Sequence, residues 1–222
     1  MVREEGGNLI LDNGVKVELI TENVCPKCKK NLPDSALPQD CECEIYPFES
    51  VLTVGYYYRG WYNKPNKYDL KYRYSKLIND AKARAKFTTK RQKKAIIRHL
   101  CKGLAFKLKK YDSEILNKIQ VIVHVPKKNE KEKFNHGYYY AHFLSEELDI
   151  PFHSEVVFEH STSKKGDKFY LIGDNEPIKG KNVLIVDDTY TDGTNKGQIS
   201  EILDDYGANE IYIAVAARSF WY

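Results

Sequence analysis

The sequence predicts an α/β protein with a mostly parallel sheet flanked by helices, and two observations carry this prediction. First, three segments are apolar along almost their whole length, at 119–125, 183–186 and 210–217. Strands that are apolar at every position are buried on both faces, as in the parallel sheets of α/β domains. Second, a helical apolar pattern follows the middle segment and ends at Gly207, which completes a strand–loop–helix unit.

A short polar loop joins that strand to that helix, and it begins with Asp187 and Asp188. Open α/β sheets bind ligands at the carboxyl ends of their strands, which is where this loop is expected. Backbone N–H groups at the following helix start favour a phosphate, and two carboxylates can accept hydrogen bonds from sugar hydroxyls. The loop therefore predicts a ribose-phosphate site. The alternative is a buried strand followed by an acidic turn that binds no ligand.

The segment 183–195 resembles the signature of the type I phosphoribosyltransferases, which bind phosphoribosyl pyrophosphate (PRPP). That signature is a hydrophobic strand, two acids, two variable residues and then Thr-Thr-Gly-x-Thr or a close relative. Thr191 and Gly193 match it, whereas Asp192 and Asn195 depart from it. A carboxylate at position 192 would repel a phosphate, so we expect PRPP to bind more weakly than it would with threonine there.

This resemblance implies a role for each residue of the segment. The ribose hydroxyls would be held by a catalytic pair of acids, Asp187 and Asp188. The 5′-phosphate would be held by a loop that consists of Thr189, Tyr190, Thr191, Asp192, Gly193, Thr194 and Asn195. Mg²⁺ would accompany PRPP, because this ion is usually held by substrate phosphates, waters and one or two carboxylates. Just past the strand that ends at Pro126, two lysines are placed for the pyrophosphate, Lys127 and Lys128.

Four of the five cysteines fall within a short N-terminal stretch and predict a structural zinc site: Cys25, Cys28, Cys41 and Cys43. A Cys-x-x-Cys turn aims two thiolates at one metal ion, and four thiolates complete a tetrahedral site. Such a site stabilises a small lobe and performs no chemistry. A redox-active pair of Cys25 and Cys28 is the alternative, but the βαβ context of thioredoxin-like proteins is missing.

The chain is expected to divide into an N-terminal β and zinc module, residues 1–48, and a larger domain, residues 49–222. Weak alternation over 8–23 around an Asp-Asn-Gly step predicts a hairpin. β-branched and aromatic residues at 51–58 predict a strand. The aromatic residues of 46–74 either pack across a sheet or, with the basic residues among them, stack on nucleic-acid bases.

A long amphipathic helix is predicted over residues 82–110. This stretch holds twelve Lys or Arg residues and no acid. Because no carboxylate within the stretch can pair with these side chains, a polyanion such as nucleic acid is a predicted partner. The alternative is a charged face that contacts only solvent.

The order of these segments narrows the resemblance to the ComF family, which are competence-associated phosphoribosyltransferase-like proteins with an N-terminal cysteine zinc module. The strand that ends in Val-Pro, the basic loop and the helix after Phe134-Asn135 occur in the family's order. The family's usual text is Pro-Val-Pro followed by Arg-Gly-Phe-Asn-Gln, so His124, Glu132-Lys133 and His136 depart from it. Residues 150–182 depart most.

Those residues predict two strands, at 154–158 and 168–172, with a polar loop between them. Elsewhere, no apolar run reaches the roughly 18 residues of a membrane span, and the N-terminus has no apolar core of a secretory signal. The protein is therefore expected in the cytoplasm, where cysteines stay reduced.

The expected function is that of a PRPP-binding, phosphoribosyltransferase-like enzyme that transfers phosphoribose to an unidentified acceptor and releases pyrophosphate. The alternative is a zinc-containing, nucleic-acid-associated protein of DNA uptake or processing that keeps the fold with little catalysis. A purine-salvage enzyme is a third interpretation, although the cysteine module and the basic helix have no place in it. A homodimer is also among the expectations.

Overall fold

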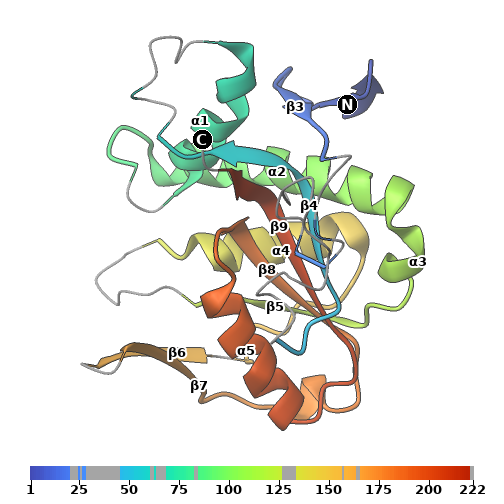
Figure 1. Ribbon diagram of the computed structural model, residues 1–222, viewed down its shortest axis with the longest axis vertical. Helices are drawn as coiled ribbons and strands as arrows, with labels where there is room; N and C mark the ends of the chain where they lie inside the picture. Colours follow the sequence, from blue (N-terminus) through green and yellow to red (C-terminus); the bar gives the residue numbers. More distant parts are fainter. Residues whose placement is uncertain are drawn as a thin grey trace.

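The computed structural model describes most of the chain as a central sheet with helices around it (Figure 1). The described residues are 1–20, 25, 27–28, 46–60, 63, 69–82, 85–126, 134–156, 158–163 and 166–220. No helix among them combines the length and the apolar character needed to cross a bilayer.

The centre of the molecule is a four-stranded parallel sheet (Figure 1). Its strands follow the order β4 (Ser50–Tyr58), β9 (Ile211–Phe220), β8 (Val183–Tyr190) and β5 (Val121–His124). All neighbouring strands run parallel, and every residue of β8 is buried. The predicted parallel sheet is therefore confirmed, and its strands come from the four segments that the sequence marks as strands.

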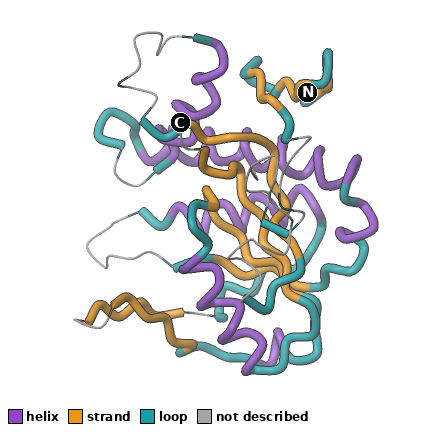
Figure 2. Tube along the Cα trace, viewed as in Figure 1, coloured by secondary structure: helices purple, strands orange, loops and turns teal. Residues whose placement is uncertain are grey.

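Helices cover both faces of this sheet, so the molecule has three layers (Figures 1 and 2). On one face lies α5 (Thr194–Asp205), whose Ile199 and Leu203 join the core on that side. On the other face lie α2 (Lys90–Tyr111) and α4 (His136–Leu148). Each strand thus meets apolar side chains on both sides, which explains why the strand sequences do not alternate between apolar and polar residues.

Side chains along β8 alternate between the two faces, as in any strand. Val183 and Ile185 belong to the core that contains α5 residues. Leu184 and Val186 belong to the core that contains α2 and α4 residues. The same alternation decides where the side chains at the end of β8 point.

The basic stretch 82–110 is not helical from its first residue, so the prediction of one helix from residue 82 was wrong about its start. α1 (Leu70–Ala81) ends before Lys82, and α2 begins at Lys90. Thr89 starts α2 because its hydroxyl accepts a hydrogen bond from the Gln92 N–H at 3.2 Å. In return, the Gln92 side chain accepts one from the Thr89 N–H at 2.9 Å. This capping box places the helix start later than the charge pattern indicates.

Two aromatic residues that were expected in a sheet lie instead in α1, namely Tyr72 and Tyr74. The Tyr74 hydroxyl donates a hydrogen bond to the Ala216 carbonyl of β9 at 2.5 Å. The backbone N–H of Tyr58, at the end of β4, donates one to the Ser75 hydroxyl at 2.9 Å. These contacts hold α1 over the carboxyl ends of β4 and β9.

The N-terminal residues form a small antiparallel sheet of β1 (Arg3–Glu5), β2 (Asn8–Ile10) and β3 (Lys16–Glu18). The predicted hairpin is confirmed between β2 and β3. Leu11 packs against Gly103 of α2, where any larger side chain would overlap it. The small sheet therefore shares its core with the rest of the molecule, and the domain boundary stays a prediction.

A second hairpin consists of β6 (Phe158–Ser163) and β7 (Gly166–Leu171), which pair antiparallel. The strands expected at 154–158 and 168–172 were wrong in their bounds, because most of the predicted polar loop is itself strand. The remaining short helices are α3 (Ser113–Leu116) and the 3-10 helix η4 (Glu176–Ile178).

Candidate functional site

The predicted acidic pair lies at the carboxyl edge of the sheet, near the end of β8. Asp187 and Asp188 are each 6% exposed. Because side chains alternate, Asp187 points to the α5 face and Asp188 to the face of α2 and α4. Their carboxylate oxygens still converge, since they and an imidazole nitrogen of His136 all lie within 4.8 Å of one another.

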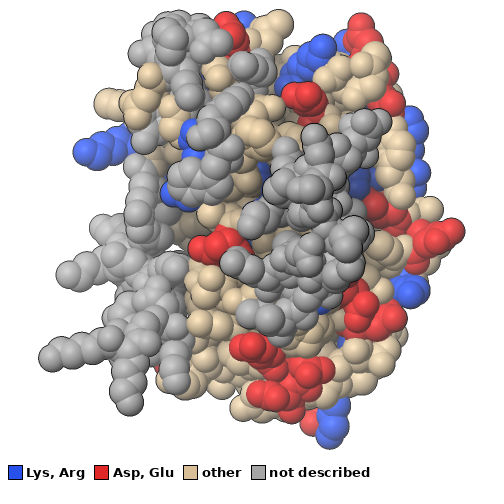
Figure 3. All heavy atoms as spheres, in the orientation of Figure 1, with Lys and Arg blue, Asp and Glu red and all other residues tan. Residues whose placement is uncertain are grey.

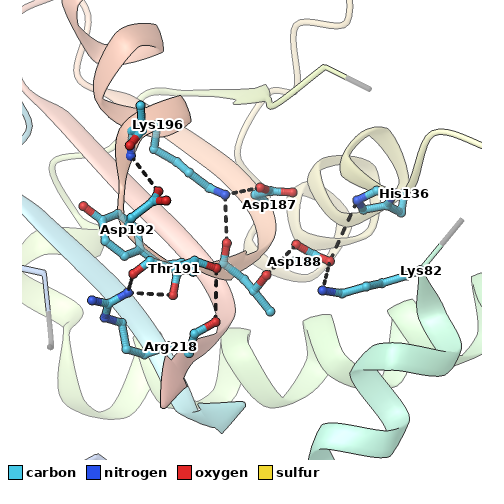
Figure 4. A network of polar contacts seen from close by, with 12 residues as sticks. Lys82, His136, Asp187, Asp188, Thr191, Asp192, Lys196 and Arg218 are labelled. Carbon is cyan, nitrogen blue, oxygen red and sulfur yellow. Dashed lines mark hydrogen bonds and ion pairs between the residues drawn. The ribbon is translucent and has the colours of Figure 1, made fainter. Parts of the chain in front are cut away.

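Lys196 of α5 reaches back across the loop to Asp187 (Figure 4). Its ammonium forms an ion pair with the Asp187 carboxylate and donates a hydrogen bond to the Thr189 carbonyl at 2.8 Å. Lys196 is only 7% exposed, so water screens this pair little. Separation of the two side chains would leave an uncompensated buried charge on each. This cost favours the paired arrangement.

Asp188 is paired by basic groups from two other elements (Figure 4). Its Oδ2 lies 3.4 Å from Lys82 Nζ and 3.8 Å from His136 Nε2. The Thr189 hydroxyl donates a hydrogen bond to Oδ1 at 2.9 Å. Burial by itself would raise the pKa of Asp188, but the surrounding cations, led by Lys82, outweigh burial and hold the pKa well below its usual value. Asp188 is therefore ionised at neutral pH.

Lys82 is the residue that directly follows α1, and its side chain reaches the site from there. Its ammonium also lies over the Tyr57 ring, 4.8 Å from the ring centroid. Burial lowers the pKa of Lys82, but the neighbouring Asp188 carboxylate raises it above the ordinary lysine value. Lys82 is thus charged and is held by both an acid and an aromatic ring.

The loop turns into α5 at Gly193, whose φ is 89°. Side chains rarely accommodate this conformation, and a Cβ here would also overlap the Tyr190 hydroxyl. The turn starts α5 directly beside the acidic pair. The first N–H groups of that helix carry the partial positive charge that binds phosphates in other proteins.

Asp192 folds back onto the start of α5 (Figure 4). Its Oδ1 accepts a hydrogen bond from the Thr194 N–H at 3.0 Å. The Asp192 carboxylate thus acts as an internal anion at the loop, because it accepts from an N–H group for which a phosphate at the helix start would compete. Asp192 is exposed, and a rotation of its side chain would free the N–H.

Arg218 of β9 holds the first part of the loop and was not predicted as a site residue. Its guanidinium donates hydrogen bonds to the carbonyls of Tyr190, at 2.8 Å, and of Thr191. The hydroxyls of Thr191 and Ser219 form a second link at 3.1 Å. An arginine near the end of an otherwise apolar strand is the sequence feature that marks this role.

His124 ends β5, opposite Val186 of β8. Its ring packs edge-on against Tyr138 and Phe152, with centroids 5.9 and 5.7 Å away. Burial lowers the pKa of His124 to about 4, against the opposing pull of Asp187. The imidazole is therefore neutral at neutral pH and adds no charge to the site.

The acidic pair does not fit a protein-bound divalent cation as it is arranged. Carboxylate and imidazole groups are suitable metal ligands, and those of His136, Asp187 and Asp188 lie close together. However, the ammonium groups of Lys196 and Lys82 already contact these carboxylates, and they would repel a cation placed there. The Mg²⁺ expected with PRPP remains an expectation from the resemblance.

Cys25 and Cys28 are both buried, and the Cys28 N–H donates a hydrogen bond to Cys25 Sγ at 3.5 Å. Two thiols in such a turn fit half of a tetrahedral zinc site. The other predicted zinc ligands and the predicted pyrophosphate lysines lie outside the described residues, namely Cys41, Cys43, Lys127 and Lys128. The zinc ion is therefore still a prediction.

Many basic side chains of α2 have acidic partners, most of them on other elements. These ion pairs join Arg98 to Glu146, Lys102 to Asp12, Lys107 to Asp112 and Lys110 to Glu4. Figure 3 shows basic and acidic side chains interspersed among the coloured atoms of the face it presents. The basic surface that is available to nucleic acid is smaller than the sequence indicates, and a nucleic-acid partner stays a prediction.

Among solved structures, the chain is similar to several phosphoribosyltransferases. For a purine phosphoribosyltransferase from Pyrococcus horikoshii, the identity is 27% over 56% of this chain and 80% of that one, with a TM-score of 0.39. For an adenine phosphoribosyltransferase from Saccharomyces cerevisiae, the identity is 21% over 57% and 78%, with a TM-score of 0.38. For a hypoxanthine phosphoribosyltransferase from Staphylococcus aureus, it is 19% over 57% and 74%, with a TM-score of 0.41.

No protein-family model matches the sequence, and no curated protein matches it. The TM-scores of these structural matches are low, so the similarity by itself assigns no function to this chain.

Proposed function

We propose that the protein binds PRPP at the carboxyl end of β8 and transfers its phosphoribosyl group to an unidentified acceptor, with release of pyrophosphate. The observation that carries this proposal is the placement of two buried carboxylates, Asp187 and Asp188, a few residues before the Gly193 turn into α5. Carboxylates accept hydrogen bonds from sugar hydroxyls, and a helix start attracts a phosphate. A ribose 5-phosphate carries both groups.

In the proposed complex, the ribose hydroxyls donate hydrogen bonds to Asp187 and Asp188. The 5′-phosphate accepts them from backbone N–H groups between Tyr190 and Thr194. Asp192 rotates away so that the Thr194 N–H turns to the phosphate. Arg218 supports this exchange because it fixes the loop carbonyls and leaves the loop N–H groups to the ligand.

In the proposed reaction, the bond between the anomeric carbon and the pyrophosphate oxygen breaks, and its electron pair leaves with the pyrophosphate. The positive charge that develops on the ribose ring is stabilised by nearby carboxylates. Asp188 suits this role because its low pKa keeps it ionised. A nitrogen of the acceptor then forms the new bond to the anomeric carbon, and the proton of that nitrogen passes to solvent.

Titration calorimetry with PRPP tests the binding step. We expect measurable binding to the wild-type protein and a loss of about tenfold or more in Asp188→Asn, because the ribose contact loses its charge. Asp205→Asn is the matched control, since Asp205 is an exposed acid at the other end of α5. Equal affinities of the wild-type protein and both variants for PRPP would show that the acidic pair is not part of the binding site.

A second variant tests the role of Asp192. Asp192→Thr removes the internal anion, and we expect the affinity for PRPP to rise by about tenfold through lost charge repulsion. An unchanged affinity would mean that the 5′-phosphate does not bind at this loop.

The finer proposal is a ComF-like protein, in which Cys25, Cys28, Cys41 and Cys43 hold a structural zinc ion. The buried Cys25–Cys28 turn supports it. Metal analysis of the purified protein should find about one zinc ion per chain. A chain without zinc, or an equal zinc content in Cys25→Ser, would contradict this part of the proposal.

Association with nucleic acid is the second candidate function. It is supported by exposed basic residues at the start of α2, such as Lys90 and Arg91. Binding to single-stranded DNA at low ionic strength should weaken as salt rises and should fall in Lys90→Ala/Arg91→Ala. Binding that is undetectable at low ionic strength would exclude it.

A further inference from the structure

Both carboxylates of the proposed ribose site have ammonium partners of their own. Lys196 pairs with Asp187, and Lys82 pairs with Asp188 at 3.4 Å. Two positive charges thus balance two negative charges at the carboxyl edge of β8. His136 adds a third basic group, 3.8 Å from Asp188. The charge that an incoming ligand meets is therefore neutral or positive.

We infer that this site binds a sugar phosphate without a protein-bound divalent metal ion, because Lys82 and Lys196 supply the positive charge that such an ion would supply. This inference rests on the function proposed above and specifies it further, since it names the ionic form of the ligand. The sugar phosphate binds as the anion itself, without a divalent metal ion between it and the protein.

The two lysines are built into the fold from opposite faces of the sheet. Lys196 projects from α5, is 7% exposed and donates a hydrogen bond to the Thr189 carbonyl as well as contacting Asp187. A divalent ion on Asp187 would have to displace this buried ammonium, which would leave the Thr189 carbonyl without that donor. Displacement would also move a buried charge away from its partner, which is costly.

Lys82 is held independently of Lys196. It follows α1, contacts Asp188 and lies 4.8 Å over the Tyr57 ring. Because the two lysines come from separate elements, the loss of one leaves the other in place. Each lysine can therefore be replaced while the other keeps its own carboxylate partner.

The experiment is a calorimetric titration of the full chain with ribose 5-phosphate, once in EDTA and once in excess Mg²⁺, with a third arm in Mn²⁺. Ribose 5-phosphate is the probe because it lacks the pyrophosphate that would itself chelate the metal. We expect the dissociation constants in the three arms to agree within about threefold. Binding only in the presence of Mg²⁺ or Mn²⁺ would overturn the inference and leave the proposed function standing. No binding in any arm would overturn the proposed function and the inference with it.

Variants separate the lysines from a general charge effect. In Lys196→Met, we expect the affinity in EDTA to fall by about tenfold and Mg²⁺ to restore part of it, because Asp187 is then open to a cation. Lys82→Met should behave in the same way at Asp188, and it serves as the test if Lys196→Met does not fold. Lys181→Met removes an exposed lysine elsewhere and should match the wild-type protein. Folded lysine variants that bind as well in EDTA as the wild-type protein does would contradict the role of the lysines.

Discussion

The turn between β8 and α5 depends on a single glycine. Gly193 and Gly180 both have left-handed backbones, with φ of 89° and 67°. Only Gly193 is also crowded, since a Cβ there would overlap Tyr190, whereas nothing lies within 4 Å of a Cβ at Gly180. Substitutions at these two glycines therefore distinguish the cost of backbone strain alone from the added cost of steric overlap.

We predict that Gly180→Ala lowers the free energy of unfolding by about 1 kcal/mol, through backbone strain alone. Gly193→Ala should cost about 1–3 kcal/mol more, because the new methyl group also displaces the Tyr190 ring. Urea denaturation followed by circular dichroism measures both. Equal losses of unfolding free energy in the two variants would contradict this prediction, because they would show that the Tyr190 ring moves aside at no cost.

The buried imidazole of His124 makes the stability of the protein depend on pH. Its pKa is about 4 in the folded protein and near 6.5 when the chain is unfolded, because burial disfavours the imidazolium. The unfolded chain therefore binds the proton first, and the folded state loses up to about 3 kcal/mol relative to it as pH falls from 6.5 to 4. His124→Phe should lose less stability than the wild-type protein over this interval. Parallel pH profiles of the free energy of unfolding would contradict the assignment.

The sequence identifies some residues of the site and misses others for a physical reason. Asp187, Asp188 and Gly193 are contiguous, so a local pattern of strand, acids and glycine turn locates them. Lys82 and Arg218 reach the same place only through the path of the chain, one from the end of α1 and one from β9. Their contribution depends on tertiary structure, which a local pattern does not contain.

The break between α1 and α2 positions Lys82 at the site. Thr89 and Gln92 start α2 through reciprocal hydrogen bonds of 3.2 and 2.9 Å. If α2 began at residue 82, that residue would be part of a continuous basic helix. The cap therefore helps to place the cation beside Asp188.

Removal of this cap should destabilise the protein. Thr89→Ala loses the hydroxyl acceptor, and we predict a loss of about 1 kcal/mol in the free energy of unfolding. Thr89→Ser keeps the hydroxyl and should lie within a few tenths of a kcal/mol of the wild-type protein. Chemical denaturation monitored at a helix-sensitive wavelength distinguishes the two variants, and equal loss in both would contradict a capping role.

Strands and helices differ in how well the sequence predicts them here. Runs of aliphatic residues locate β5, β8 and β9, because burial on both faces leaves no choice of residue type. Helix α1 is hidden, since its tyrosines favour strands locally and become helical only when they pack on β9 and β4. Tertiary contacts thus override local propensity in that segment.

The N-terminal sheet and the central sheet share one core. Leu9 and Leu11 are 0% and 1% exposed and belong to the same buried cluster as Leu104 of α2 and Leu184 of β8. The sequence predicts the three layers but not this docking, because the fit depends on Gly103 facing Leu11. A separate module would show its own unfolding transition.

We predict that Leu11→Ala lowers the stability of the entire molecule by about 2–5 kcal/mol, since it leaves a cavity in the shared core. Circular dichroism and tyrosine fluorescence should report one common transition that moves to lower denaturant. Lys16→Ala, an exposed change in the same small sheet, should have little effect. Two transitions, with only one of them shifted by Leu11→Ala, would show that the N-terminal residues fold as a unit of their own.

The central claim is that the end of β8 is a ribose-phosphate site, and a crystal structure of the protein soaked with PRPP tests it most directly. The claim predicts density for the ribose hydroxyls beside Asp187 and Asp188 and for the 5′-phosphate at the loop from Tyr190 to Thr194. It also predicts that Asp192 has left the Thr194 N–H. Density elsewhere on the molecule, or a loop unchanged at saturating PRPP, would contradict the claim.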